Sequence, residues 1–455
     1  MNRQIIQVLK DWKKRANRKP LIVRGARQVG KTYAIEEFAV AEFENYIKLN
    51  LEERPDCKKL FHDSDVLNIV SELSVLFNQK IIPEKTLLFI DEIQTCPEAI
   101  LALRYFKEKM PNLHVIAAGS LLDHTLNEMN YSMPVGRVEF CYMYPMSFKE
   151  FLWAIGEEAV VNYIEAFNFK KLFSETIHKQ LLKYVRTYFF IGGMPEVVKT
   201  YIENKNDYSD VERIQSSIIT SFQYDFAKYG TKTQLENLLK VLRYCGNNIG
   251  KKIKYSNIDR DSRSTNLKEA IKKLEYSRIV HLIKHTQAGK IPLSNHVKDE
   301  IYKPLFMDIG LANHLSGIQL VDIENLLTAH EGTLAEQFIG QELLANTKPY
   351  LDPTLYYWTR EEKNSNAEID FLYQHHNTIY PIEVKAGKGN TLKSLHVYLF
   401  EKKLKMGIRF NTELPNTMNA KVKVQAANKN EELVYNLLSL PIYLCSELER
   451  ILSRT

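Results

Sequence analysis

Residues 25–32 of this chain read Gly25-Ala26-Arg27-Gln28-Val29-Gly30-Lys31-Thr32 and match the pattern G-x-x-x-x-G-K-[ST] at every fixed position. An apolar run at 21–23 precedes the motif, and a helix-like stretch beginning at Tyr33 follows it. Strand, glycine-rich loop and helix together form a phosphate cradle, because the loop N–H groups and the positive end of the helix dipole face one point. We expect the loop and Tyr33 to bind ATP, with Lys31 on the β- and γ-phosphates and Thr32 on Mg²⁺.

The bulk composition is that of an ordinary globular protein with several domains. The chain has 455 residues, of which 45% are hydrophobic and 25% are charged. Its five cysteines are scattered and form no C-x-x-C pair, so neither a zinc knuckle nor a disulfide framework is indicated. Residues 1–19 are charged and lack the apolar core of a signal peptide, and no apolar run approaches the roughly 20 residues of a membrane span. We therefore expect a cytoplasmic protein without a membrane partner.

Hydrophobic periodicity predicts an α/β fold with several domains. Four short apolar runs have the character of buried parallel strands, separated by stretches with helical spacing: 21–23, 45–49, 86–90 and 114–118. Residues 150–225 then have helical spacing throughout, broken by a Gly-Gly-Met-Pro turn. Residues 232–290 contain three short helical patterns and a strand-like run, which is a winged-helix outline. From about residue 330 the α/β pattern returns.

Two carboxylates follow the third predicted strand, about 60 residues after the glycine-rich loop. They are Asp91 and Glu92, and they end the apolar run 87–90. The strand ends of such a sheet carry the site, so Asp91 is expected to support Mg²⁺ and Glu92 to activate the attacking water. The alternative is that these carboxylates only solvate the end of a strand. A complete phosphate-binding loop about 60 residues upstream favours the functional interpretation.

Two further residues are candidates for the same site. Ser120 ends the next predicted strand, where its hydroxyl would lie near the γ-phosphate, although strand-end serines also cap the following helix. Arg137 follows a glycine and is a candidate for stabilising the transition state, because a guanidinium can neutralise charge on the phosphoryl oxygens. Whether Arg137 acts within its own subunit or in a neighbouring one stays open.

A second constellation lies near the C-terminus. Asp370, Glu383 and Lys385 have the spacing D-x₁₂-E-x-K, which resembles the PD-(D/E)xK nucleases. Period two places Glu383 and Lys385 on one face of a sheet. Asp370 and Glu383 would hold Mg²⁺, and Lys385 would orient the attacking water. Glu336, on a helix predicted upstream, is a further ligand candidate, and Glu368 is a spare carboxylate on the same strand face as Asp370.

The E-x-K pattern by itself is very common. A salt-bridged exposed face of a β-hairpin is one alternative to the nuclease interpretation, and a nuclease fold retained only for binding is another. Both alternatives stay open at this point.

Positive charge is concentrated in the predicted winged helix. Residues 250–284 hold ten Lys or Arg and four Asp or Glu, and this excess equals the net charge of the whole chain, +6. A polyanionic partner, DNA or RNA, is one interpretation. A solvated helix face or a protein-docking module is the other. The basic residues that could contact phosphates are Lys251, Lys252, Lys254, Arg260, Arg263, Lys268, Lys272 and Lys273, with Tyr255 and Tyr276 interleaved.

Over nearly its full length the chain resembles bacterial and archaeal AAA+-type ATPases that carry a C-terminal domain of unknown function. The resemblance is carried by residues 25–32, Asp91-Glu92-Ile93-Gln94, Ala118-Gly119-Ser120, 134–140, 144–148, 192–196 and 368–371. It implies a P-loop ATPase core over 1–150, a helical lid over 151–230, a winged-helix-like part over 231–300 and a restriction-endonuclease-like α/β domain of the PD-(D/E)xK kind over 301–455. Many AAA+ proteins have Asn where Ser120 stands, so the role of that residue is not carried over.

Three functions fit these observations. The first is a Mg²⁺-dependent ATPase that acts on, or is regulated by, nucleic acid through its C-terminal modules. The second is an ATP-driven switch that acts on a protein partner, with a catalytically inactive nuclease-like domain. The third is a nucleotide-binding regulator with negligible turnover. An oligomer is compatible with each of them.

Overall fold

The structure, a computed structural model, describes residues 2–63, 65–120, 122, 134, 136–204, 208–227, 231–317, 331–361, 367–385, 391–426 and 429–454. The chain divides into two compact units. Unit 1 consists of Met1–Pro145, Lys272–Ile279 and Thr347–Asp352, and unit 2 consists of Met146–Ile271, Val280–Asn346 and Pro353–Thr455. A parallel sheet with helices stands in unit 1 and a second sheet in unit 2, so the expected α/β multidomain class is confirmed.

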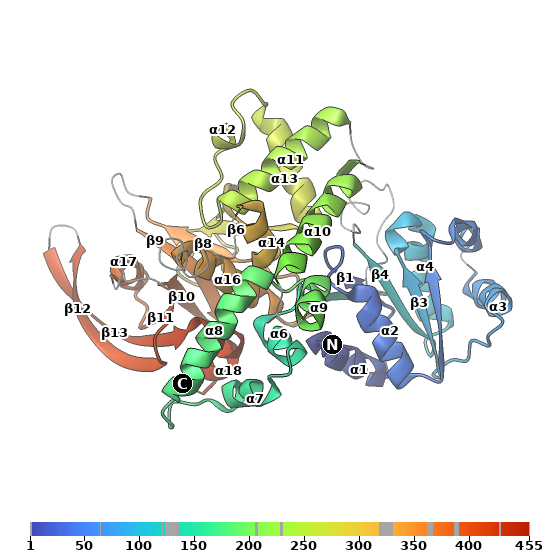
Figure 1. Cartoon of the computed structure of the whole chain (residues 1–455), viewed down its shortest axis with the longest axis horizontal. Helices are drawn as coiled ribbons and strands as arrows, with labels where there is room; N and C mark the ends of the chain where they lie inside the picture. Colours follow the sequence, from blue (N-terminus) through green and yellow to red (C-terminus); the bar gives the residue numbers. More distant parts are fainter. Residues whose placement is uncertain are drawn as a thin grey trace. The chain divides into compact units, whose positions relative to one another are not determined.

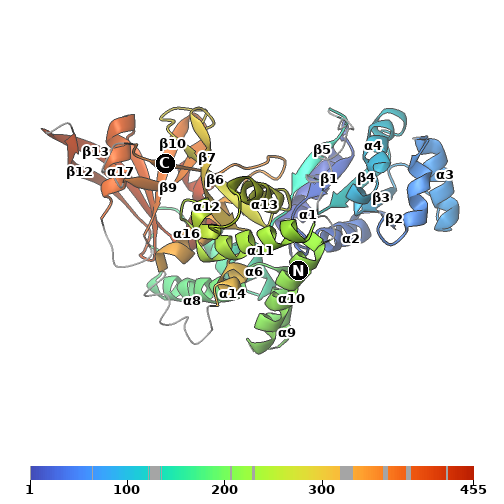
Figure 2. The same cartoon turned by 90° about the horizontal axis from the view of Figure 1, so that it is seen from above.

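Unit 1 is built around a parallel sheet in the order β2-β3-β4-β1-β5 (Figure 1; all five strands are labelled in Figure 2). The predicted strands are present, but sequence analysis missed β5. The strands are β1 (Leu21–Arg24), β2 (Asn45–Asn50), β3 (Thr86–Asp91), β4 (His114–Gly119) and β5 (Glu139–Tyr142). The helices are α1 (Gln4–Lys14), α2 (Lys31–Glu42), α3 (Val66–Leu76) and α4 (Pro97–Lys109), with short 3₁₀ turns η1 (Pro55–Phe61) and η2 (Ile93–Thr95).

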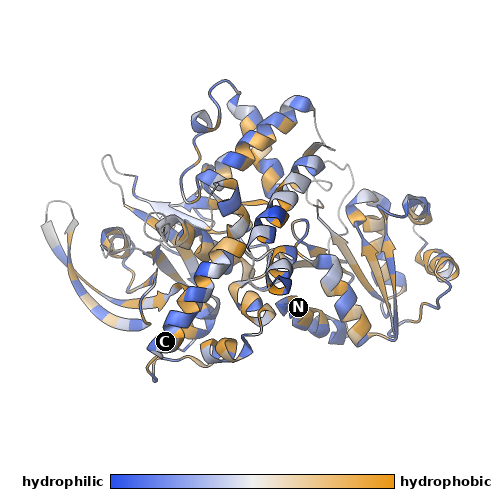
Figure 3. Ribbon diagram, in the orientation of Figure 1, coloured by the Kyte–Doolittle hydropathy of each residue, from blue (hydrophilic) through white to orange (hydrophobic). Residues whose placement is uncertain are grey.

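The central strands of this sheet are apolar on both faces. Every residue of β1, β3 and β4 is buried, which is the pattern of a parallel sheet covered by helices on both sides. Figure 3 shows the apolar residues gathered along these strands. The carboxyl ends of parallel strands meet at one edge, so the segments that follow β1, β3 and β4 come together there.

Unit 2 begins with a group of helices. They are α6 (Phe148–Ala154), α7 (Glu158–Ala166), α8 (Glu175–Ile191), α9 (Pro195–Glu203), α10 (Ser209–Ala227), α11 (Lys232–Asn247) and α12 (Tyr255–Ile258). Next comes α13 (Ser264–Tyr276), within which the boundary between the units falls. Helices α11–α13 lie in the region for which sequence analysis predicted a winged helix, and the strands after them belong to the eight-stranded sheet of unit 2.

The predicted Gly-Gly turn joins α8 to α9, and it requires both glycines. Gly192 has φ +75°, and a Cβ there would lie 2.1 Å from Asp308 Oδ1. A Cβ on Gly193 would lie 2.1 Å from the Met146 carbonyl oxygen. Asp308 in turn accepts the Gly193 N–H at 2.6 Å and caps α14 (Ile309–Leu315). No side chain other than hydrogen fits this close approach.

The sheet of unit 2 has the order β12-β13-β11-β10-β9-β8-β6-β7. Its strands are β6 (Val280–Thr286), β7 (Val297–Phe306), β8 (Tyr356–Thr359), β9 (Glu368–His375), β10 (Thr378–Val384), β11 (Met406–Asn411), β12 (Asn416–Ala426) and β13 (Lys429–Pro441). Helices α16 (Glu331–Ala345) and α17 (Lys393–Lys402) pack on this sheet, and η4 (Ile442–Glu447) and α18 (Leu448–Leu452) end the chain's regular structure. Figure 2 shows β12 and β13 as a long hairpin. Sequence analysis missed β7 and β11–β13.

Two other expectations concern the chain as a whole. The five cysteines are buried and unpaired thiols. Within the part of the chain that the structure describes, none of the helices combines the length and the apolar character that a bilayer crossing needs.

Candidate functional site

The loop of residues 25–32 connects β1 to α2 in unit 1. Gly30 has φ +91° and precedes Lys31, the first residue of α2, so the loop delivers its N–H groups to the positive end of the helix. A Cβ on Gly25 would lie 2.2 Å from the Met143 carbonyl oxygen, which explains the first glycine of the motif. Within the loop Ala26 and Val29 are buried, and Arg27, Gln28 and the following Tyr33 are more exposed.

Lys31 is buried inside its own loop. Its ammonium donates hydrogen bonds to the carbonyl oxygens of Gly25 at 3.0 Å and Ala26 at 2.8 Å. Burial lowers the pKa of Lys31 to about 8, although the charges of Glu92 and Asp91 act in the opposite direction. The side chain therefore lies near the carboxylates of Asp91 and Glu92, and an anionic ligand bound there would raise its pKa again.

Thr32 and Asp91 meet at the carboxyl edge of the sheet. The Thr32 hydroxyl donates to Asp91 Oδ2 at 2.9 Å, and the two residues are 59 positions apart in sequence. Asp91 is 4% exposed, and burial raises its pKa while the Thr32 hydrogen bond acts against that shift. A hydroxyl and a carboxylate in this arrangement are the protein groups that hold Mg²⁺ in P-loop proteins. Both residues fit the metal role that sequence analysis gave them.

Glu92 follows Asp91 in a left-handed conformation, with φ +52° and ψ +42°. Gln94 donates to Glu92 Oε2 at 2.5 Å, which fixes the direction of the carboxylate. Ser120 follows Gly119 at the end of β4, between β3 and β1 in the sheet order, and it is buried. The structure therefore brings the loop, Asp91, Glu92 and Ser120 to the same edge of the sheet.

Arg137 lies at the opposite edge. Its guanidinium pairs with Glu108 at the end of α4 at 2.9 Å and is about half exposed. Glu139, two positions later, is in register with Leu21, the first residue of β1. Arg137 therefore lies near the start of β1, whereas the loop follows the last residue of that strand. Within one chain the structure does not bring Arg137 to the loop.

Sequence analysis missed one residue that supports the loop. Arg3, which stands before α1, is buried and donates to the Val29 carbonyl oxygen at 2.9 Å and to the Tyr144 carbonyl oxygen at 2.7 Å. It ties the chain's first residues to the phosphate-binding motif. No local pattern marks this arginine, because its two partners lie 26 and 141 positions away.

The second constellation lies on the sheet of unit 2. Strands β9 and β10 are antiparallel, and their register pairs Phe371 with Ile382, which places Asp370 next to Glu383. Asp370 Oδ2 accepts the Val384 N–H at 2.7 Å, and Lys385 pairs with Glu383 Oε1 at 2.6 Å. Asp370, Glu383 and Lys385 are therefore adjacent, as the spacing predicts.

The carboxylates of this site have raised pKa values. Burial and then the charge of Asp370 raise the pKa of Glu383 to about 8, and burial raises that of Glu336 to about 7. Burial raises the pKa of Asp370, although Lys303 and Lys385 act against it. Glu383 Oε2 is buried and has no hydrogen-bond partner among the described residues. Clustered carboxylates that resist ionisation are a feature of functional sites.

Lys303, on β7, is the residue of this site that sequence analysis missed. Its side chain is 1% exposed and pairs with Glu336 at 3.1 Å and with Glu368 at 2.5 Å. Glu336 is therefore close to the site, but its direct partner is a lysine. Among the described residues, no group of three or more His, Cys, Asp or Glu side chains is arranged to hold a metal ion. A lone lysine in a stretch for which sequence analysis predicted no strand offered no signal.

The basic residues before β6 are partly engaged within unit 2. Lys252 pairs with Glu368 at 3.7 Å and Lys268 with Glu300 at 3.5 Å. The Tyr255 hydroxyl shares a hydrogen bond of 2.7 Å with the Tyr302 hydroxyl. One edge of this basic segment thus borders the acidic site.

Comparison with protein families identifies three regions of the chain. Residues 17–152 match the family described as an AAA domain. Residues 182–322 match a domain of unknown function, DUF8612, and residues 331–442 match another, DUF4143.

Two curated relatives come from Methanocaldococcus jannaschii and are themselves uncharacterised. The protein MJ1544 is 28% identical over 188 residues, which are 41% of this chain and 37% of that protein. MJ1637 is 23% identical over 253 residues, 52% of this chain and 50% of that protein. The chain thus spans half or less of the length of these relatives.

Solved structures with a related arrangement include three at low identity. They are the ORC2 protein of Aeropyrum pernix (11% identity, 72% of this chain and 94% of that one, TM-score 0.34), DnaA of Aquifex aeolicus (12%, 60% and 88%, 0.26) and RuvB of Thermotoga maritima (13%, 66% and 93%, 0.29). At these TM-scores the likeness carries no argument of its own. Residues 17–152, which contain the P-loop, thus match the AAA domain family, and residues 331–442 match a C-terminal domain of unknown function.

Proposed function

We propose that this protein is a Mg²⁺-dependent ATPase whose reaction takes place at residues 25–32. The observation that carries the proposal is the 2.9 Å hydrogen bond between the Thr32 hydroxyl and Asp91, with Lys31 beside it. A loop ready to bind phosphates and a hydroxyl–carboxylate pair ready to hold a metal stand together at one sheet edge. This combination suits a metal–triphosphate complex better than a free anion.

Each residue has a role in this proposal. Loop N–H groups and Lys31 bind the phosphates, and Thr32 and Asp91 hold the metal. Mg²⁺, when bound by these two residues, would supply positive charge that offsets the charge of the phosphates. Glu92 orients and polarises the attacking water, and Ser120 lies near the terminal phosphate.

The test is loss of nucleotide binding in Lys31→Ala, measured by calorimetry with ATP and Mg²⁺. Lys85→Ala is the matched control, because Lys85 is half exposed, pairs with Glu44 and precedes the first residue of β3, at the other edge of the sheet. We expect Lys31→Ala to abolish binding and Lys85→Ala to retain it. Unchanged affinity in Lys31→Ala would defeat the assignment.

We further propose that Arg137 acts on the nucleotide of a neighbouring copy in an oligomer. Its position at the far edge from its own loop supports this, because within one chain it has no route to the phosphates. Arg137→Ala and Lys31→Ala proteins, each inactive alone, should then restore turnover when mixed, since each supplies what the other lacks. No recovery on mixing would exclude action between copies.

We also propose that ATP hydrolysis controls the processing of nucleic acid. In this proposal an ATPase core (1–150) and a helical lid (151–230) are followed by a winged-helix-like part (231–300) and a nuclease-like part (301–455), and the last two act on the nucleic acid. Asp370 and Glu383 would hold a divalent cation, and Lys385 would orient the attacking water. The unpartnered, buried Glu383 Oε2 supports a ligand at this position. The alternative is a switch that acts on a protein partner, with an inactive nuclease-like domain. Measurements of nucleic-acid binding and cleavage distinguish the two functions.

A further inference from the structure

Lys303 is one of the most enclosed charged side chains in the described part of unit 2. It lies on β7 opposite Ile283 of β6, and 1% of its side chain is exposed. Lysine is almost never fully buried unless it is paired, because its ammonium loses strong hydration. A buried lysine at the margin of an acidic site therefore needs an explanation.

The contacts of Lys303 supply that explanation. Its ammonium lies 3.1 Å from Glu336 Oε1 on α16 and 2.5 Å from Glu368 Oε1 on β9, and 4.9 Å from the centre of the Tyr357 ring. One cation thus joins carboxylates from a helix and a distant strand. On the other side of Glu336, a Cβ on Gly250 would lie 2.4 Å from Oε2, so the carboxylate has little room to turn away.

The four carboxylates of the site therefore fall into two pairs. Glu336 and Glu368 share Lys303, whereas Asp370 and Glu383 lie next to Lys385. The second pair contains an unpartnered oxygen. Glu383 is 3% exposed, and its Oε2 is buried with no hydrogen-bond partner among the described side chains and backbone groups, so this pair offers a position for a ligand.

We propose that Lys303 takes the place of a divalent cation between Glu336 and Glu368, so that the acidic site binds a single metal ion, at Asp370 and Glu383. The inference rests on the proposed nuclease-like site and specifies its metal content. It makes Lys303 a positioning residue and assigns Glu336 to the lysine. One ammonium between two carboxylates satisfies the electrostatic need that a second ion would otherwise meet.

The experiment counts Mn²⁺ ions bound to the nucleotide-free full chain by calorimetry. Relative to the wild type, Asp370→Asn should remove one bound ion. Glu368→Gln, which would act only through Lys303, should keep that ion and weaken its binding by about 10–100-fold at most. Lys303→Met should bind one additional ion, and the double variant Lys303→Met/Glu368→Gln should lose it again. Lys303→Arg should bind the wild-type number. Lys284→Met, on the neighbouring strand β6, is the control for removing a strand lysine and should also bind the wild-type number.

The outcomes separate this inference from the proposed function. If Glu368→Gln abolishes Mn²⁺ binding as Asp370→Asn does, Glu368 is a ligand and the inference is wrong. An unchanged ion count in folded Lys303→Met overturns it too. If Asp370→Asn changes nothing, the proposed metal site fails, while the extra ion in Lys303→Met still supports the role of Lys303. Should Lys303→Met not fold, the comparison of wild type with Glu368→Gln decides.

Discussion

At the scale of single residues, the proposed ATP site of unit 1 depends on short polar contacts, one of them between residues far apart in sequence. Thr32 reaches Asp91, and Gln94 holds Glu92 at 2.5 Å. Gln94 Oε1 is buried without a hydrogen-bond partner among the described groups. A Cβ on Gly119 would lie only 2.4 Å from this oxygen, which is too close. Glycine at 119 therefore leaves room for the side chain that directs Glu92.

The first residue-scale prediction concerns Glu92. Glu92→Gln keeps the size of the side chain but cannot accept a proton from water, so turnover should fall by about 10²–10⁴-fold while ATP still binds. Phosphate release and ATP calorimetry measure the two effects. Glu44→Gln is the matched control, because Glu44 pairs with Lys85 at the other edge of the sheet. Normal turnover in Glu92→Gln would assign the base to another residue.

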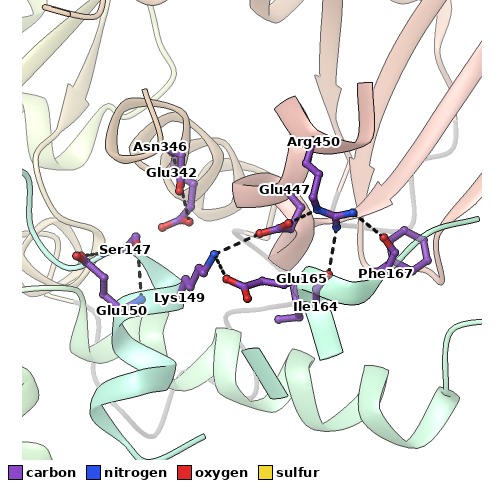
Figure 4. Close-up of polar contacts among 10 residues, drawn as sticks. All are labelled: Ser147, Lys149, Glu150, Ile164, Glu165, Phe167, Glu342, Asn346, Glu447 and Arg450. Atoms are coloured by element: carbon purple, nitrogen blue, oxygen red, sulfur yellow. Dashed lines mark hydrogen bonds and ion pairs between the residues drawn. The ribbon is translucent and has the colours of Figure 1, made fainter. Parts of the chain in front are cut away.

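At the scale of elements, the start of α6 in unit 2 is held by a buried carboxylate from a distant helix. Ser147 and Glu150 form a capping box (Figure 4), and Glu342 of α16 accepts the Phe148 N–H at 2.8 Å. Asn346 donates to the other oxygen of Glu342 at 3.3 Å. Two helices that are separated by almost 200 residues are thus joined through one side chain.

A network of charges lies beside this junction. Lys149 of α6 pairs with Glu165 and with Glu447, and Arg450 pairs with Glu447 at 2.5 Å (Figure 4). Arg450 also donates to the Phe167 carbonyl oxygen at 2.8 Å, which fastens α18 to the end of α7. These contacts hold α6, α7, η4 and α18 together.

The element-scale prediction follows from the pKa of Glu342, which burial raises to about 7. Because the folded state holds this proton more tightly than the unfolded chain, its stability should fall as pH rises from about 4.5 to about 7 and stay low above that. Glu342→Gln removes the ionisation. The unfolding free energy of the variant, taken relative to that of the wild type, should therefore be about 3 kcal/mol higher at pH 8 than at pH 5.

Denaturant unfolding at the two pH values measures this difference. Glu432→Gln is the control, since Glu432 is more than half exposed on β13 and pairs with Lys421 across the hairpin. The control should show the same pH dependence as the wild type. If the difference in unfolding free energy between the wild type and Glu342→Gln is the same at both pH values, Glu342 does not titrate in this range.

At the scale of the whole molecule, the chain combines two sites of different chemistry in two units. One is the proposed phosphate-binding site at the carboxyl edge of a parallel sheet, and the other gathers carboxylates and lysines on a mixed sheet. In unit 2 the basic residues 251–254 border the carboxylates through Lys252 and Glu368. A polyanion bound to this basic edge would lie next to Asp370 and Glu383.

The corresponding prediction is nucleic-acid binding that weakens steeply with salt. Because each lysine–phosphate contact releases counterions, Lys251→Ala/Lys254→Ala should lower the slope of log K against log salt by about 2. Fluorescence anisotropy over a salt series measures the slope. Lys421→Ala on β12, which is exposed, should leave it unchanged. With Mg²⁺ or Mn²⁺, cleavage of the bound strand should be lost in Lys385→Ala.

The outcome also decides between the proposed functions. No binding of DNA or RNA at low salt, where electrostatic attraction is strongest, would favour the switch that acts on a protein partner. Binding without cleavage would leave the nuclease-like domain as a binding module. ATP should change the affinity if the two sites are coupled.

Much of unit 1 could be predicted from the sequence because its information is local. A buried strand, a glycine-rich loop and a helix are adjacent in residues 21–42, and the strand ending at Asp91 has the same apolar pattern. The D-x₁₂-E-x-K spacing likewise places Asp370 beside Glu383, since a tight hairpin fixes the register of β9 and β10. Strands β12 and β13 alternate buried and exposed residues in part, which is the pattern of a half-buried strand, but sequence analysis did not identify them.

The sequence alone determined the phosphate-binding loop, the carboxylates that follow β3, and the pairing of Asp370 with Glu383, because each depends on neighbours or on a short hairpin. The tertiary structure alone decided that Arg3 supports the loop, that Arg137 lies at the far edge of its sheet, and that Lys303 joins Glu336 to Glu368. Those contacts join segments tens to more than a hundred residues apart. Only packing of the sheets and helices brings such charges together, because no local pattern encodes the distance between them.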